Sequence, residues 1–442
     1  MDKKRNNTNS KNLYRRAKKV LAGGVSRNTI FRKPHPYYVS TAEGSYITDI
    51  DGVKRIDFAN NMASLIHGHS NSKIIKAVSN QLIRGTAYTM GSEIEVKFAE
   101  LLSKRNPNFE KIRFMNSGTE AVMTMIKASR AYTGKTKIAK AEGTYHGTYD
   151  YAEISQLSNP SNWGDINNPK STSVVQGTPK NVLNDVIIFP YNDIERTINI
   201  LENHASELSC VLIDLVPHRV GLIPGNYEFI ESLYKWTRKN NTILAFDEVV
   251  TYRANYAGAQ ENYSIKPDLT ALGKIIGGGF PIGALAGKSE IMKVLDPTEK
   301  VLKHPHSGTF SANPISTTAG FTAMKMFNKE SVIKLNHLTS IAKAQIQEAI
   351  KLSQIPACIT GVGSMFRIHL QENQPATFRE AYQSEETKEV INDLLDYLFI
   401  EENIIMINTC ACMFSTSLIQ DDIDKLSEAL LRGFNKIKNK LN

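Results

Sequence analysis

The stretch from Leu244 to Gly283 constrains the fold of this chain more than any other. The apolar run Ile243 to Phe246 predicts a buried strand, and Asp247 follows it directly. A second predicted strand, Asp268 to Leu272, leads through one glycine to Lys274, and three consecutive glycines come shortly after. An acid and a lysine therefore each follow a strand, in loops where glycine lets another group approach closely.

Lys274 and Asp247 together indicate one kind of chemistry. A lysine amine whose pKa is lowered by its surroundings is suited to forming a Schiff base with a carbonyl group. An aspartate at a strand end is suited to pairing with a protonated pyridine nitrogen, and this combination is how proteins hold pyridoxal phosphate. Taken separately, Asp247 is typical of a residue that caps a helix, and Lys274 is typical of a solvated lysine in a loop. Their combination favours a pyridoxal phosphate site.

The motifs FDEV, PDLTALGK, IIGGG and PIGA in this stretch resemble the signature of class III pyridoxal-phosphate aminotransferases. The most similar branch is glutamate-1-semialdehyde aminomutase and its relatives that act on β-amino acids, and the resemblance runs from about Leu21 to about Ala429. It implies an α/β fold of type I, as in aspartate aminotransferase, with a mostly parallel seven-stranded sheet in a large domain and a smaller α/β domain. The implied division places residues 1–72 with the small domain, 73–328 in the large cofactor-binding domain and 329–442 in the C-terminal small domain.

The same resemblance assigns roles around the cofactor ring. It implies that Lys274 is the catalytic Schiff-base lysine, that Asp247 holds the pyridine nitrogen and that Val249 packs against one face of the ring. Tyr145 follows another short predicted strand, and the aromatic of this motif stacks on the ring in relatives, which suits the flat apolar face of tyrosine. His146 is expected to orient the surroundings of the ring rather than to carry protons.

The segment RFMNSGTEAV predicts a phosphate site. A strand ending at Phe114 or Met115 gives way to Ser117, Gly118 and Thr119, and a helix is expected to begin near Glu120. A helix N-terminus offers unpaired N–H groups and the positive end of a dipole, which together bind phosphate. A Ser-Gly-Thr turn on its own is typical of helix capping. Beside Lys274 and Asp247, it is expected to bind the cofactor phosphate, as the family resemblance also implies.

The segment HSGTFSANPISTTAG resembles the one whose threonine reaches the cofactor phosphate of a neighbouring subunit. This makes Thr309 the expected residue and implies a homodimer whose active site is shared across the interface. The alternative is an ordinary helix cap before Pro314.

Three further residues are candidates for substrate binding. Arg27 matches an arginine that binds a substrate carboxylate in the β-amino-acid branch, and a guanidinium suits a carboxylate because it donates two parallel hydrogen bonds. The sequence departs from the family at CVLIDLVPHRV, where Glu-Pro is usual, and His218 and Arg219 follow instead. They are expected either to bind substrate or to point away. Relatives carry a charged residue in the region of INTCACMF, but residues 408–411 here are uncharged, which weakens both known specificities as assignments.

Composition excludes several other classes of function. A hydrophobic content of 41% and a charged content of 22% are ordinary for a globular protein, and 442 residues suggest two domains. The net charge of +9 is concentrated near the two ends, as in solvated helix faces, so nucleic acid is not expected as a partner. No apolar stretch suits a signal peptide or a membrane span. The four cysteines form no disulfide framework, which favours the cytoplasm. The pair His67 and His69 invites a metal site, but a structural role is expected and no metal is.

Several elements outside the site are also predictable. The segment GSYITDIDGVKRIDFA predicts a β-hairpin with a type I′ turn at Asp51-Gly52. Residues 155–184 lack periodicity and are expected to form a lid or a disordered loop. Helices are predicted over 11–22, 73–83, 330–353 and 385–401, with a closing helix from Asp421 or Asp422.

These observations predict an enzyme that transfers an amino group between an amino acid, or an amino-carbonyl compound, and a keto acid or aldehyde through Lys274. An intramolecular aminomutase uses the same residues, and racemases and decarboxylases share the fold. A non-catalytic relative that binds pyridoxal phosphate is a further alternative, against which the intact Lys274, Asp247 and Thr309 argue. The amino donor and acceptor are not predictable from the sequence.

Overall fold

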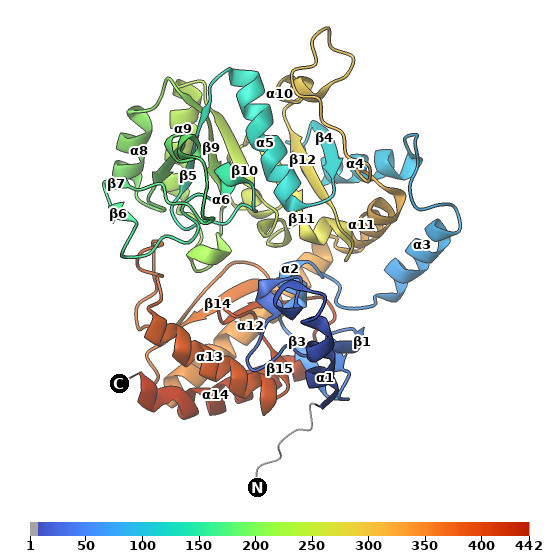
Figure 1. The fold of residues 1–442 in the computed structure, drawn as a ribbon, viewed down its shortest axis with the longest axis vertical. Coiled ribbons are helices and arrows are strands. Elements are labelled where there is room, and N and C mark those ends of the chain that lie inside the picture. Colours follow the sequence, from blue (N-terminus) through green and yellow to red (C-terminus); the bar gives the residue numbers. More distant parts are fainter. Residues whose placement is uncertain (1–7, 442) are drawn as a thin grey trace.

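The computed structural model describes residues 8–441, which form two lobes (Figure 1). The upper lobe in Figure 1 is built on a seven-stranded sheet with the strand order β4-β12-β11-β10-β9-β5-β8. All neighbouring strands run parallel except at β12, which is antiparallel to both β11 and β4. The predicted mostly parallel seven-stranded sheet is therefore confirmed. Its strands are β4 (Lys111–Met115), β5 (Lys137–Ala141), β8 (Val186–Phe189), β9 (Leu208–Ile213), β10 (Ile243–Asp247), β11 (Leu269–Gly273) and β12 (Gly283–Gly287).

Strands β9, β10 and β11 are buried along their whole length. This agrees with their continuous apolar sequences, because parallel strands are covered by helices on both faces. The helices of this lobe are α3 (Ser72–Leu82), α4 (Glu93–Arg105), α5 (Gly118–Thr133), α6 (Asp150–Glu153), α7 (Lys180–Asn184), α8 (Ile194–Glu202), α9 (Tyr227–Lys239), α10 (Ser289–Met292) and α11 (Pro314–Met326).

The lower lobe combines the two ends of the chain. Strand β15 (Ile404–Ile405) pairs in parallel with β3 (Lys54–Asp57), so one four-stranded sheet, β1-β2-β3-β15, contains N-terminal and C-terminal residues. A three-stranded sheet, β13-β14-β16, lies beside it. The remaining elements are α1 (Thr8–Ala17), β1 (Val39–Glu43), β2 (Tyr46–Asp49), α2 (Asn60–Ala63), α12 (Lys329–Ser353), β13 (Cys358–Thr360), β14 (Met365–His369), α13 (Glu385–Ile400), β16 (Ala411–Met413) and α14 (Gln420–Ile437).

A fully buried arginine, Arg253, links the two lobes. It follows β10 in the upper lobe, and its guanidinium donates to Ser364 Oγ (3.0 Å), to the carbonyl oxygen of Ala63 (3.2 Å) and to that of Phe414. Every nitrogen of this guanidinium thus has an acceptor, which offsets the cost of removing the charge from water.

The hairpin of β2 and β3 forms as predicted, but the predicted turn type is wrong. A type I′ turn needs positive φ at both central residues, and of residues 50–52 only Gly52 has positive φ (+85°). The carboxylate of Asp51 instead accepts hydrogen bonds from the N–H groups of Asn9 and Ser10. The turn is therefore wider and ends on a left-handed glycine.

Other predicted boundaries shift by a few residues. Helix α1 ends at Ala17, earlier than the predicted 22, and α5 begins at Gly118, two residues before Glu120. The segment 155–184 contains a short hairpin of β6 (Gly164–Asp165) and β7 (Asn168–Pro169) and ends in α7.

The His67 and His69 rings have separate structural partners. His67 bonds Thr416 Oγ1 (2.8 Å) and the carbonyl oxygen of Ala323 (2.9 Å), whereas His69 Nε2 lies 2.8 Å from Asp57 Oδ2. Within residues 8–441 no helix has the length and apolar character needed to cross a membrane.

Candidate active site

Lys274 lies directly after β11 as the first residue of a short 3-10 helix, Lys274–Gly277. Its φ of +48° is in the left-handed region, which costs a residue with a side chain about 1–2 kcal/mol. The side chain is half-buried and lines a cavity between the two lobes. Burial lowers the pKa of Lys274, and the negative charges of Asp247 and Asp214 oppose this shift. No hydrogen bond or ion pair within residues 8–441 holds its amine.

Asp247 ends β10 and is fixed in one orientation by two hydrogen bonds. Its Oδ1 accepts from the N–H of Val249 (2.9 Å), and its Oδ2 lies 2.7 Å from Nδ1 of His146. The other ring nitrogen of His146 is 3.0 Å from Oγ1 of Thr144. Burial lowers the pKa of His146, and Asp247 opposes that shift. The histidine therefore orients the carboxylate of Asp247.

Three predicted motifs meet around Val249. A Cβ added to Gly118 would lie 2.6 Å from Val249 Cγ1, and one added to Gly273 would lie 3.2 Å from the same atom. The approach at Gly118 leaves no room for a side chain, and the approach at Gly273 leaves little. The phosphate motif and the last residue of β11 therefore both pack against Val249, which follows β10.

The N-terminus of α5 is arranged as an anion site. Ser117 is the N-cap, and its Oγ accepts from the N–H of Glu120 (3.1 Å). The N–H groups of Gly118 and Thr119 belong to the first turn, where no intrahelical acceptor exists. These groups and the dipole of a 16-residue helix favour a phosphate.

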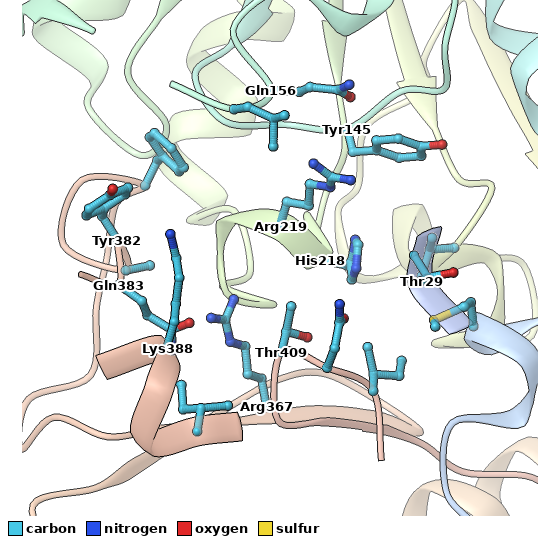
Figure 2. A pocket seen from close by; sticks show the side chains of 18 of the residues that line it. Thr29, Tyr145, Gln156, His218, Arg219, Arg367, Tyr382, Gln383, Lys388 and Thr409 are labelled. Carbon is cyan, nitrogen blue, oxygen red and sulfur yellow. The ribbon is translucent and has the colours of Figure 1, made fainter. Parts of the chain in front are cut away.

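The cavity beside Lys274 has a volume of about 820 Å³, and the predicted residues Tyr145, His218, Arg219 and Arg27 line it. Figure 2 labels the first three of them. Tyr145, His218 and Arg219 come from the loops after β5 and β9, and Arg27 comes from the N-terminal segment. The guanidinium of Arg219 lies over the ring of Tyr145, 4.8 Å from its centroid. Arg27 donates to Asn61 Oδ1 (2.8 Å). His218 and Arg219 thus face the cavity, which was one of the two alternatives for them.

The segment that departs from the family pattern contains two buried titratable residues, Asp214 and His218, whose main charged neighbours have opposite signs. Burial lowers the pKa of His218 to about 3, and Lys274, Arg219 and Arg367 add to the shift. Burial raises the pKa of Asp214 well above its ordinary value, and the negative charge of Asp247 adds to this effect. Positive groups therefore surround His218, while the two acids lie on the side of β9 and β10.

Arg367 was not predicted as a site residue. It occupies the middle of β14, where the sequence MFRIHL predicted only a strand. It is 4% exposed and lines the cavity beside Thr409, which is carried by the turn before β16 (Figure 2). A charged residue between Phe366 and Ile368 in a buried strand was the available signal, because arginine is rarely buried without a partner.

Comparisons with known proteins decide the family. The model of the family "Aminotransferase class-III" matches residues 30–430. The chain belongs to the class III aminotransferases. The predicted family, the type I fold and an enzyme of amino-group transfer are thereby confirmed.

Individual relatives of this class III aminotransferase agree with the assignment. The glutamate-1-semialdehyde 2,1-aminomutase of Methanococcus maripaludis is 35% identical over 380 residues, covering 86% of this chain and 87% of the relative. The crystal structure of an omega-transaminase from Sphaerobacter thermophilus is 40% identical with a TM-score of 0.95, covering 97% of each chain. A transaminase with bound pyridoxal phosphate is 35% identical with a TM-score of 0.90, covering 98% of each chain.

Thr309 does not line the cavity. It lies instead at a small cleft with Tyr88, Met90 and Ser92, formed by the loops before α4 and α11. This class III aminotransferase exposes apolar side chains nearby, with Met90 exposed by 83% and Phe310 by 57%. Within one chain, Thr309 and Lys274 thus line different cavities.

Proposed function

We propose that this chain is a pyridoxal-phosphate-dependent aminotransferase that uses Lys274 to move an amino group between an amino acid, or an amino-carbonyl compound, and a keto acid or aldehyde. The observation that supports this most is the amine of Lys274. It is half-buried, has a lowered pKa and faces a cavity without a partner among the described residues. A structural lysine in such a place would be expected to donate hydrogen bonds.

The residues present fit the cofactor. Asp247 would pair with the pyridine nitrogen, because its carboxylate is buried and held in place by Val249 N–H and His146. Ser117, Gly118 and Thr119 would bind the phosphate through the N-terminus of α5. Tyr145 and Val249 would cover the two faces of the ring. When bound, the cofactor supplies an aldehyde that condenses with amines and a ring that accepts an electron pair.

Residues of this chain would perform the remaining steps, which are proton transfer, charge stabilisation and substrate positioning. The amine of Lys274, once released, holds and moves the proton at the substrate carbon, and its lowered pKa suits it to act as a base. Asp247 keeps the pyridine nitrogen protonated, because a buried carboxylate stabilises the positive charge beside it. Arg27 positions a substrate carboxylate, and the walls of the cavity limit the access of water.

The aminomutase reaction is a second candidate, because curated relatives at 35% identity are named glutamate-1-semialdehyde 2,1-aminomutase. The two reactions use the same residues and differ in whether the amino group leaves. Transfer of the amino group to added pyruvate or 2-oxoglutarate supports the aminotransferase.

We also propose a cytoplasmic homodimer in which Thr309 reaches the cofactor phosphate of a second copy. The exposed apolar side chains near Thr309 support an interface, and the four free cysteines suit a reducing compartment. The proposed domains are 73–328 for the large domain and 1–72 with 329–442 for the small one. The pairing of β3 with β15 supports this division.

A visible absorption spectrum tests the role of Lys274. The protein with added pyridoxal phosphate is expected to absorb visible light and, after borohydride reduction, to carry the mass of one cofactor per chain. Lys274→Ala is expected to lose the covalent mass entirely, because no other amine replaces it. The matched control is Lys266→Ala, an exposed lysine before β11, which should label like the wild type. Unchanged labelling of Lys274→Ala would contradict the proposal.

A further inference from the structure

Arg367 is buried without the partners that a buried arginine normally has. Its Nε has no hydrogen-bond partner, and no acid within residues 8–441 forms an ion pair with its guanidinium. Arg253 provides the contrast, because each of its three nitrogens has an acceptor. An unpaired buried charge is costly. Arg253 is therefore structural, whereas the charge of Arg367 is left available to the cavity that it lines.

Other polar atoms in the same cavity wall also lack partners. They are Oγ1 of Thr409, Nε2 of Gln383 and Oε1 of Gln156. Thr409 lies in the turn closed by the hydrogen bond from Cys410 N–H to the carbonyl oxygen of Ile407 (2.9 Å), and the adjoining strand β16 pairs with β14 at Arg367. Figure 2 shows Thr409 and Arg367 next to each other, rising from the lower lobe into the cavity. Buried polar groups are seldom left unsatisfied, and several in one cavity indicate a polar ligand.

The charge of this wall is positive. Arg219 faces the cavity from the upper lobe and forms no ion pair with any acid in residues 8–441. The positive charges of Arg219 and Arg367 both lower the pKa of His218. Figure 2 shows Arg219 entering the cavity from the upper lobe and Arg367 entering it from the lower lobe. The remaining cation and acid of this part of the wall, Lys388 and Glu385, neutralise each other at 2.6 Å. The ligand that completes these groups is therefore an anion.

We infer that Arg367 and Arg219, with Thr409, form a subsite for an oxyanion at the end of the substrate remote from its amino group. Guanidinium groups match carboxylate and phosphoryl oxygens, and the hydroxyl of Thr409 donates a further hydrogen bond. The inference rests on the proposed function, since Lys274 defines where the amino group lies. With Arg27 binding one carboxylate, the favoured substrates carry two anionic groups. Arg219 and Arg367 thereby determine specificity.

Titration calorimetry of the cofactor-loaded enzyme tests the subsite with unreactive probes. Glutarate and 4-phosphonobutanoate carry a second anionic group, and butanoate lacks it. At least one of the two is expected to bind about tenfold or more tightly than butanoate, since a hydrogen-bonded charge pair is worth at least that. Which one binds better tells whether the oxyanion is a carboxylate or a phosphoryl group. Arg367→Met should remove the preference and leave butanoate affinity within about twofold, and Arg367→Lys should restore part of it.

The controls separate this inference from the proposed function. Arg432→Met removes an exposed arginine of α14 that pairs with Glu402 and should leave all three affinities unchanged. If Arg367→Met does not fold, Arg219→Met and Thr409→Val carry the test. Equal affinity of the wild type for all probes, or equal loss of all three in Arg367→Met, would overturn the subsite. Absence of cofactor absorption in the wild type would contradict the proposed function instead, and the same titration on cofactor-free protein would then decide the subsite.

Discussion

Two titratable side chains in the same cavity have lowered pKa values for different reasons. Burial lowers the pKa of Lys274, while the acids at the ends of β9 and β10 oppose the shift. At His218, burial acts together with the positive charges of Lys274, Arg219 and Arg367, and nothing opposes it. The acids therefore limit the lowering of the Lys274 pKa, whereas His218, with a pKa of about 3, is neutral at physiological pH. The pKa of a residue in this cavity wall thus depends on the charges that face it as well as on its burial.

The neutral state of His218 predicts how stability depends on pH. Its pKa is about 3 in the folded protein and has its ordinary value of about 6.5 in the unfolded chain. As the pH falls from 7 to 5, the unfolded chain therefore binds a proton that the folded protein does not. The free energy of unfolding of cofactor-free protein should fall by about 1–2 kcal/mol from this residue alone.

His218→Gln is expected to lose this part of the pH dependence in urea unfolding measured at pH 7, 6 and 5. His204→Gln is the control, because His204 lies at the surface beside Glu207 and should keep the wild-type slope. If the free energy of unfolding of His218→Gln falls with pH as steeply as that of the wild type, His218 is not held neutral in the folded protein.

The ends of the strands explain why distant motifs meet. Strands β4, β5, β9, β10 and β11 run in the same direction, so the residues that follow them lie along one edge of the sheet. Ser117, Tyr145, His218, Asp247 and Lys274 all follow these strands, as is general for sites of open α/β sheets. The antiparallel strand β12 contributes none of them.

The loop after β5 depends on a buried lysine in that strand. The amine of Lys140 donates to the carbonyl oxygens of Thr144 (2.9 Å), Ala152 (2.7 Å) and Ile154 (2.7 Å), and the residue is fully buried. Lys140→Met leaves three buried carbonyl groups without a donor. The free energy of unfolding should therefore fall by about 3 kcal/mol or more, measured by denaturant titration.

Lys135→Met is the matched control for Lys140. Lys135 also donates to two carbonyl oxygens, those of Ala205 and Asn240, but it is partly exposed, so water can replace it. Its loss should cost less than about 1 kcal/mol. Equal losses in the two variants would mean that the three buried bonds do not hold the loop.

The sequence allowed the prediction of candidate site residues that lie directly at the end of a strand. It did not allow the prediction of residues whose role depends on the direction of the side chain. The positions of Lys274 and Asp247 at the ends of strands were predictable because each comes at the end of a continuous apolar run. The direction of Arg219 was not, since a residue in a loop can face the cavity or solvent. Arg367 and Thr409 belong to a different sheet, and only the packing of that sheet against the upper lobe brings them to the cavity. The turn at Gly52 was misjudged, and in the structure Asp49 Oδ1 accepts hydrogen bonds from the N–H groups of Asp51 and Val53.

At the scale of the whole molecule, the cavity depends on both lobes. Arg27 and Thr409 come from the lower lobe, and Tyr145 and Arg219 come from the upper one. The loop with Thr409 thus meets groups from elements far apart in sequence. In the proposed homodimer, the exposed side chains of Met90 and Phe310 beside Thr309 would lie at the interface with the second copy.

Combining two variants with different defects in one dimer tests whether the site is shared between copies. Thr309→Val should weaken cofactor binding about tenfold, the worth of one hydrogen bond to a charged group. Lys274→Ala should abolish covalent attachment. In a mixed dimer of the two, the intact Lys274 of one subunit meets the intact Thr309 of the other if Thr309 acts across the interface. Such a dimer, isolated with two different affinity tags, should regain one borohydride-reducible site of wild-type affinity for the cofactor in equilibrium dialysis. If Thr309 acts within its own chain, the site that contains Lys274 keeps the roughly tenfold weaker affinity of Thr309→Val.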